Sequence, residues 1–111
     1  MSIQPKQLIA PQMLTSSAAT YYTATRVTAR VDAFTVTNTD SAAHNLTVHI
    51  VPSGGSASAS NKIIDAKAIH AHETYTCPEM IGKIIPSGSF IQALDDAGSV
   101  MSINAAGIEI T

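Results

Sequence analysis

Residues 33–52, AFTVTNTDSAAHNLTVHIVP, constrain the fold most strongly, because two runs of alternating apolar residues flank a polar segment. Phe34 and Val36 point to one side of the first run, and Leu46, Val48 and Ile50 share one face of the second. Side chains on a β-strand alternate with a period of two residues, so each run is typical of a half-buried strand. The turn-favouring residues 38–43 between the runs therefore predict a β-hairpin central to the core.

Similar strand signals recur along the chain. Residues 20–25 and 26–38 favour strand, and a change in apolar parity after Asp32 predicts a β-bulge or short turn there. Residues 62–69 favour strand over a single helical turn, and residues 105–107 predict a kink or bulge near the end of the chain. About eight to ten short strands without a convincing amphipathic helix predict an all-β fold, a single compact β-sandwich or jelly-roll-like domain. Further strands are predicted at residues 73–77, 89–94, 100–103 and 108–110.

The 111 residues fit one domain. Residues 1–19 are predicted as an extended N-terminal arm and first strand, and residues 20–111 as the β-sandwich domain. Pro5 and Pro11 forbid a regular helix in the arm. Two alternatives are open for this segment: a first strand that covers an edge of its own domain, or an arm that reaches over another subunit.

Charge is sparse, since six Lys and Arg face eight Asp and Glu and charged residues make up 13% of the chain. This balance argues against nucleic acid as a partner, because nucleic-acid binders usually carry a basic patch. No apolar run approaches the roughly 20 residues needed to cross a bilayer, so no membrane partner is predicted. A charge-poor surface favours a protein that packs against neighbours. The single Cys77 and the lack of a signal peptide suggest synthesis in a reducing cytoplasm.

Residues 52–61, PSGGSASASN, predict a flexible surface loop because they are rich in Gly and Ser. The segment lacks the glycine spacing and the terminal Lys of a phosphate-binding loop.

Catalytic and metal-binding patterns are weak. His70 and His72 would point to the same face of a strand, but a metal site needs at least three protein ligands, so a polar connector is favoured. Cys77, just before Pro78, is favoured as a small packed residue over a nucleophile. The pair Asp95 and Asp96 is explained by a turn. The sequence therefore predicts no enzyme activity, no catalytic residues, no metal and no cofactor.

A resemblance to a known family rests on three stretches. These are the opening KQLIAPQMLTSSAATYYTA, residues 35–61 with the segment TVHIVPSGG, and residues 73–93 with the segment ETYTCPEMIG. Together they resemble small auxiliary capsid proteins of short-tailed bacteriophages of the epsilon-fifteen type, described as decoration, cement or staple proteins.

The resemblance implies a structural virion protein on the capsid exterior, made in the host cytoplasm. It would clamp neighbouring subunits of the major capsid protein and self-associate as a dimer. A phage tail or baseplate component is one alternative, and a carbohydrate-binding β-sandwich that stacks sugars on Tyr21, Tyr22 or Tyr75 is another. The arm and the long loop are the natural contact elements. Candidate contact residues are Gln4, Lys6, Gln7, Leu8 and Ile9 in the arm and Ser53, Gly54, Gly55 and Ser56 in the loop.

Overall fold

The computed structural model describes residues 2–111 and contains nine β-strands and one short 3-10 helix in that range. The strands are β1 (Ile3–Met13), β2 (Ala19–Thr23), β3 (Thr28–Asn38), β4 (His44–Val51), β5 (Lys62–Ile69), β6 (Thr74–Tyr75), β7 (Ile84–Ile85), β8 (Phe90–Asp95) and β9 (Met101–Ile110), and the 3-10 helix η1 is Ala59–Asn61.

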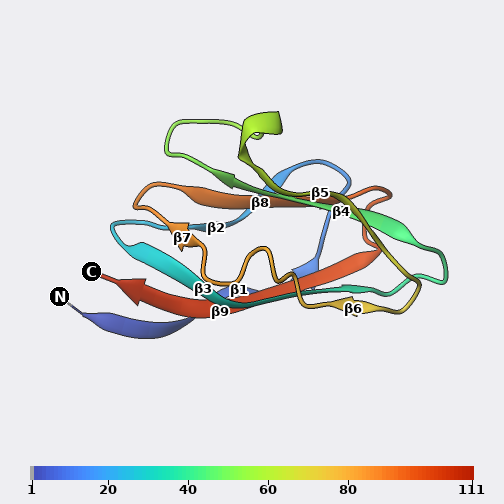
Figure 1. Cartoon of the computed structure of the whole chain (residues 1–111), viewed down its shortest axis with the longest axis horizontal. Coiled ribbons are helices and arrows are strands. Elements are labelled where there is room, and N and C mark those ends of the chain that lie inside the picture. The colour runs from blue at the N-terminus through green and yellow to red at the C-terminus, as the bar shows by residue number, and fades with distance from the viewer. Residues whose placement is uncertain (1) are drawn as a thin grey trace.

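The strands form two antiparallel sheets that lie face to face in two layers (Figure 1). The first sheet has the order β1-β9-β3-β6, with β7 also paired to β3, and the second has the order β2-β8-β4-β5. The predicted all-β fold of sandwich type is thus confirmed. The molecule is elongated, with principal extents of 46 × 26 × 19 Å.

The core lies between the sheets. Its largest fully buried side chains include Phe34 and Val31 from β3, Leu46 from β4 and Ile103 from β9. These come from alternating positions of their strands, as a sheet with one face toward the core requires.

The predicted hairpin of residues 33–52 is wrong in its pairing, although both strands exist. β3 pairs with β9, β6 and β7 in the first sheet, whereas β4 pairs with β8 and β5 in the second. The connection between them crosses from one layer to the other. Alternation identifies a strand and its buried face, but two strands that face each other across a core show the same alternation as two strands side by side.

The parity change near Asp32 is confirmed as an irregularity, because the register between β3 and β9 shifts between Val31 and Ala33. β9 runs unbroken through residues 105–107, but the bulge alternative predicted there is supported, because its registers with β1 and β3 both shift at this point. The shifts lie in its neighbours, and Gly107 sits between them: a Cβ there would meet the carbonyl oxygen of Arg30. Gly107 therefore allows β3 to approach closely at this point.

Residues 1–19 contain an edge strand of the first sheet. β1 pairs antiparallel with β9 from Ile3 to Met13, with two register shifts. Of the two alternatives for this segment, the structure has the strand that covers an edge of its own domain; Met1 lies outside the described residues.

Residues 52–61 form the predicted surface loop, and the loop has hydrogen-bonded local structure. They begin with a turn closed by the Gly55 N–H to Pro52 carbonyl hydrogen bond of 2.9 Å and end in the 3-10 helix. The Asn61 side chain bonds His49 Nδ1 at 2.7 Å, and its Nδ2 donates to the Ser56 carbonyl at 2.9 Å. The segment therefore folds back over the outer face of the second sheet, where it buries His49 and Val51.

Candidate contact surface and polar network

The candidate contact residues in the N-terminal segment divide into two groups. Gln4, Lys6 and Gln7 are exposed on the edge strand β1. Leu8 and Ile9 are only 5% and 1% exposed and belong to the chain's own core. The buried pair anchors β1 to the domain, which leaves the three polar side chains accessible to a partner.

The candidate contact residues in the loop, Ser53, Gly54, Gly55 and Ser56, are all exposed. Gly54 has a φ of +78°, which favours glycine in this tight turn. The loop follows β4 of the second sheet, whereas β1 belongs to the first sheet, so the two sets do not form one continuous patch. Both lie in the half of the molecule that holds the two chain termini (Figure 1).

The edges of the first sheet are poorly suited to pairing with another strand. β1 carries Pro5 and Pro11, which lack a backbone N–H, and also Lys6 and two register shifts. Proline, lysine and bulges are devices that blunt an exposed edge. At the opposite edge β6 and β7 have only two residues each.

The edges of the second sheet are blunted as well. β2 has five residues with a register shift, and β5 is interrupted at Ala66, whose φ is +47°. β5 also carries Lys62, Asp65 and Lys67, all exposed. Strand addition at an edge is therefore disfavoured in both sheets, and faces and loops remain as the surfaces for contact.

A largely apolar surface, with Arg30 in its middle, lies on the outer face of the first sheet beside the termini. Paired residues of antiparallel strands share a face. The pairs Pro5–Ile108, Ile108–Arg30 and Arg30–Ile84 therefore form one row across four strands, and Ile3–Ile110 lies in the next row. Ile3 is 56% exposed and Ile84 is 49% exposed. We call this surface the terminal face, and it consists of Ile3, Pro5, Arg30, Ile84, Ile108 and Ile110.

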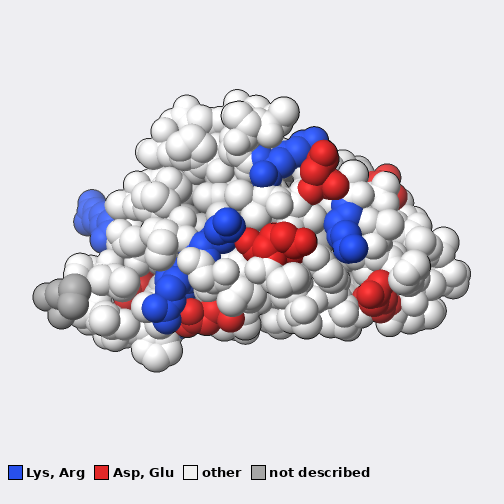
Figure 2. Space-filling view, viewed as in Figure 1, with Lys and Arg blue, Asp and Glu red and all other residues white. Residues whose placement is uncertain are grey.

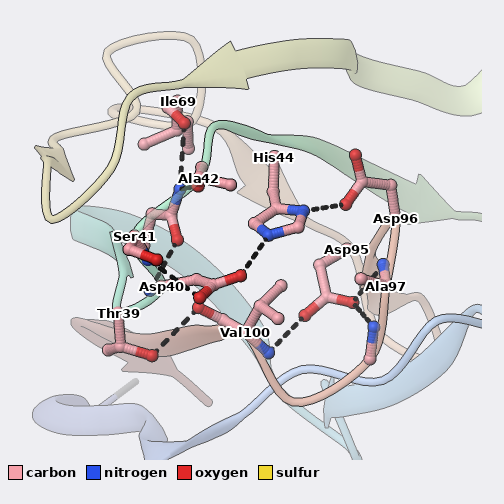
Figure 3. A network of polar contacts seen from close by, with 12 residues as sticks. Thr39, Asp40, Ser41, Ala42, His44, Ile69, Asp95, Asp96, Ala97 and Val100 are labelled. Carbon is pink, nitrogen blue, oxygen red and sulfur yellow. Dashed lines mark hydrogen bonds and ion pairs between the residues drawn. The ribbon is translucent and has the colours of Figure 1, made fainter.

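A polar network lies at the end of the molecule opposite the termini, where the chain crosses between the sheets (Figure 1), and Figure 3 shows it from close by. The His44 ring stands between two carboxylates, with Nε2 2.7 Å from Asp40 Oδ2 and Nδ1 2.7 Å from Asp96 Oδ1. Asp40 belongs to the crossing loop after β3, and Asp96 follows β8. The second oxygen of Asp96 accepts the Asn45 backbone N–H at 2.9 Å.

The geometry of this network favours a protonated imidazole, because only the charged ring donates from both nitrogens. The two carboxylates, Asp40 first, raise the pKa of His44 above its usual 6.5. In return the His44 hydrogen bond and the Ser41 backbone N–H lower the pKa of Asp40 below 3.8. Both ring nitrogens are engaged, so His44 acts here as a cross-link between a loop and a turn.

Two buried polar residues complete the polar network. Asn38 donates to the carbonyls of Ala42 at 2.9 Å and Ile69 at 3.0 Å, and thereby joins the end of β3 to the end of β5. Asp95 accepts N–H groups in the β8–β9 connection, including those of Gly98 at 2.5 Å and Val100 at 3.2 Å. The turn role predicted for Asp95 is thus present, whereas the contact of Asp96 with His44 was not predicted. The turn residues around His44 gave no signal that distant Asp96 would meet it.

The histidine pair lies on a polar connector. His70 and His72 are exposed, and His72 has a φ of +58°, so the two do not lie on one regular strand. The Glu73 carboxylate accepts the His70 backbone N–H at 2.8 Å. Within residues 2–111 no cluster of three or more His, Cys, Asp or Glu side chains is arranged to hold a metal ion.

Cys77 is buried in the core, as a packed residue would be. Burial raises the pKa of its thiol to about 12, so the thiol is neutral near pH 7. Its Sγ lies 3.6 Å from the Tyr75 carbonyl oxygen.

The three tyrosines do not form a common platform. Tyr22 is 8% exposed, and its hydroxyl donates to Glu109 at 2.6 Å between the two sheets. Tyr21 is its neighbour on β2, and its hydroxyl is buried. Tyr75 lies on β6 of the other sheet, where it bonds Glu79 and packs under the Lys67 ammonium at 5.3 Å from the ring centre.

No pocket is present in the described part of the chain, and none of its helices is long and apolar enough to span a membrane. Comparison of the chain with protein-family models, with curated proteins and with solved structures gave no match.

Proposed function

We propose that this chain is a structural virion protein that binds the exterior of a phage capsid and stabilises the shell by clamping neighbouring subunits of the major capsid protein. Its partners in this proposal are the major capsid protein and a second copy of itself. The proposal begins from the sequence resemblance, and the terminal face is the structural observation that carries it.

The terminal face supports the proposal through its chemistry. A protein that strengthens a shell must gain free energy from buried contact area, and apolar area gives about 25 cal/mol per Å² removed from water. Ile3 and Ile84, each about half exposed, offer such area on a sheet, which is a rigid support. The blunted strand edges direct contact to this face and to the exposed loops.

The sparse charge of the surface gives a second line of support. Residues 50–61 contain no Lys, Arg, Asp or Glu, and Figure 2 shows broad uncharged areas between scattered charges. Surfaces that remain in water usually carry a denser mixture of charges. A chain that is held between neighbours has less need of them.

The strand order gives a third line of support. We infer a jelly-roll arrangement from the orders β1-β9-β3-β6 and β2-β8-β4-β5, in which consecutive strands repeatedly change sheet. Double-sheet jelly rolls are used in viral capsid and lectin domains. Fold similarity of this kind supports a function without assigning it, because one fold serves many functions.

The test is to purify particles of a phage whose genome encodes this chain and to measure its copy number relative to the major capsid protein. A capsid role predicts many copies per particle, a fixed ratio to the major subunit, and retention on tailless shells. If the chain is found only in particles that carry tails, the capsid role is wrong and a tail role replaces it. A glycan array serves as a control for the carbohydrate-binding alternative, and specific hits on it would favour that alternative.

A further inference from the structure

We propose that His44 is a proton-operated latch at the end of the sandwich opposite the termini. The protonated ring holds the β3–β4 connection against the β8–β9 connection, and loss of the ring proton opens this end locally while the two sheets stay folded. The inference does not depend on the proposed capsid role, and it gives this end of the molecule a conformational change that the proposed function does not include.

The latch follows from the hydrogen bonds that the ring can make. Nε2 lies 2.7 Å from Asp40 Oδ2 and Nδ1 lies 2.7 Å from Asp96 Oδ1, and an ionised carboxylate only accepts hydrogen bonds. A neutral imidazole has a single N–H, so it can keep one of these contacts, and its other nitrogen then presents a lone pair to a negative oxygen. Loss of one proton therefore turns a cross-link into a bond on one side and a repulsion on the other.

The β3–β4 connection has little else to hold it in place. Four of the five residues 39–43 are exposed and the fifth is Asp40, so the loop has no buried apolar anchor. The Thr39 N–H and hydroxyl both bond the Val100 carbonyl, at 2.9 and 3.0 Å, and these contacts do not involve the ring. The opening is therefore confined to the residues that follow Thr39, up to the start of β4.

The β8–β9 connection is fixed independently of the latch. Asp95 is only 1% exposed, and its carboxylate accepts the N–H groups of Gly98 and Val100. The Ser99 N–H donates to the Leu14 carbonyl at 3.0 Å, which ties this connection to the end of the first strand. When the ring loses its proton, the movement therefore falls to the β3–β4 side.

The titratable groups around the ring come from three connections. Asp40 faces Nε2 and Asp96 faces Nδ1, while the carboxylate of Asp95 is occupied by backbone N–H groups. The pKa of Asp40 is lowered first by its hydrogen bond to His44 and, more weakly, by the charge of His72 on the β5–β6 connection. The two carboxylates that bond the ring, Asp40 first, raise the pKa of His44 above 6.5. The latch is therefore closed in mildly acidic solution and opens as pH rises.

NMR of the full chain tests the latch through two backbone N–H groups that the carboxylates hold. The Ser41 N–H donates to Asp40 Oδ1 at 2.8 Å, and the Asn45 N–H donates to Asp96 Oδ2 at 2.9 Å. Their protection against solvent exchange, corrected for the intrinsic exchange rate at each pH, should fall about threefold or more between pH 5.5 and pH 9. The midpoint of this change should lie above pH 6.5.

Two internal readouts show whether the change is local and whether the ring causes it. The Gly98 N–H, which Asp95 holds, should keep its protection over the same pH range. The ring-nitrogen chemical shifts of His44 should show two protonated nitrogens at pH 5.5 and one at pH 9. An equal loss of protection at Gly98, or a ring that is already neutral at pH 5.5, would overturn the proposal.

Asp96→Asn separates a latch from a merely structural contact. The amide keeps an acceptor oxygen for the Asn45 N–H and supplies an N–H to Nδ1, so a neutral ring can satisfy both of its neighbours. Protection of the Ser41 N–H should then stay nearly constant as pH rises. His44→Gln, which has no group that titrates in this range, should also remove the pH dependence and gives an independent test should Asp96→Asn fold poorly.

His72→Asn is the matched control. It removes the other imidazole near Asp40, and asparagine tolerates the left-handed backbone at this position, where φ is +58°. This variant should keep the pH dependence of wild type. A dependence that persists in both Asp96→Asn and His44→Gln, or that disappears in His72→Asn, would show that His44 is not the latch.

Discussion

The outer faces of the two sheets are treated differently by the same chain. On the second sheet, residues 52–61 close over His49 and Val51, which are 4% and 0% exposed. On the first sheet, Ile84 and Ile3 stay about half exposed. Apolar side chains on an outer face are thus either buried within the protomer, where they contribute to folding, or left accessible, where they can contribute to association. The comparison makes stability and association separable by mutation.

The largest contrast should come from one substitution placed on each face. Val51→Asp introduces a carboxylate at a fully buried position without a partner and should cost about 3–5 kcal/mol in the free energy of unfolding. Ile84→Asp places the same group on an exposed position and should change that free energy by no more than about 0.5 kcal/mol. Urea unfolding of both variants measures the difference. Equal losses would show that the two faces are not distinct.

A smaller effect should follow from loosening the loop that covers the second sheet. Asn61→Ala removes the partner of His49 Nδ1 and the hydrogen bond to the Ser56 carbonyl. It should lower the free energy of unfolding by about 1–3 kcal/mol. Ser60→Ala is the matched control in the same 3-10 helix, because the Ser60 hydroxyl bonds only the exposed Ser58 hydroxyl among the described residues. Similar unfolding midpoints for the two variants would mean that residues 52–61 do not hold this face closed.

The polar network should make stability depend on pH, with a modest size because its groups lie near the surface. The pKa of His44 is raised on folding, so its contribution is fully present below pH 6.5 and is lost as pH rises through the folded-state value. The pKa of Asp40 is lowered, so its contribution is present above pH 3.8 and is lost as pH falls through the folded-state value. The network therefore stabilises most between these two limits.

Thermal unfolding at pH 5.5 and pH 8 measures this dependence. Wild type should lose more stability than His44→Gln over that interval, because the variant has no imidazole to deprotonate. A parallel loss in the two proteins would contradict the assigned role of His44.

The smallest effect on folding is expected on β1. Lys6→Glu and Gln7→Glu alter exposed side chains of the edge strand. The free energy of unfolding of each variant should stay within about 0.5 kcal/mol of that of wild type. If these side chains contact the capsid, as proposed, both variants should bind shells more weakly. Unchanged binding would restrict the contact surface to the terminal face and the loops.

Much of the fold followed from the sequence, because strand alternation is a local property. Phe34, Val36, Leu46 and Val48 were expected to be buried and are buried, whereas Ile50 of the same predicted set is only partly buried. The irregularity near Asp32 and the strand at residues 62–69 were also predicted. The placement of β3 and β4 in different sheets was not predicted. The sheet to which a strand belongs depends on contacts between residues far apart in the sequence.

The surface features were harder to predict for the same reason. The contact of His44 with Asp96 joins residues 52 positions apart, and the terminal face combines residues from both ends of the chain. Strand alternation predicted that His49 and Val51 face away from the core, opposite Leu46, Val48 and Ile50. They are nevertheless buried, because a later segment folds over them. Of the contacts proposed from sequence, positions 4, 6 and 7 and the turn at 53–56 are exposed, whereas Leu8 and Ile9 are buried in the chain's own core.

The most direct test of the central claim is the melting temperature of purified shells with and without this protein. Shells of the major capsid protein should bind the added chain to saturation and melt at a higher temperature than bare shells, and Val51→Asp, which should not fold well, should give no increase. Bare and saturated shells that melt at the same temperature would contradict the role of this chain in stabilising a capsid.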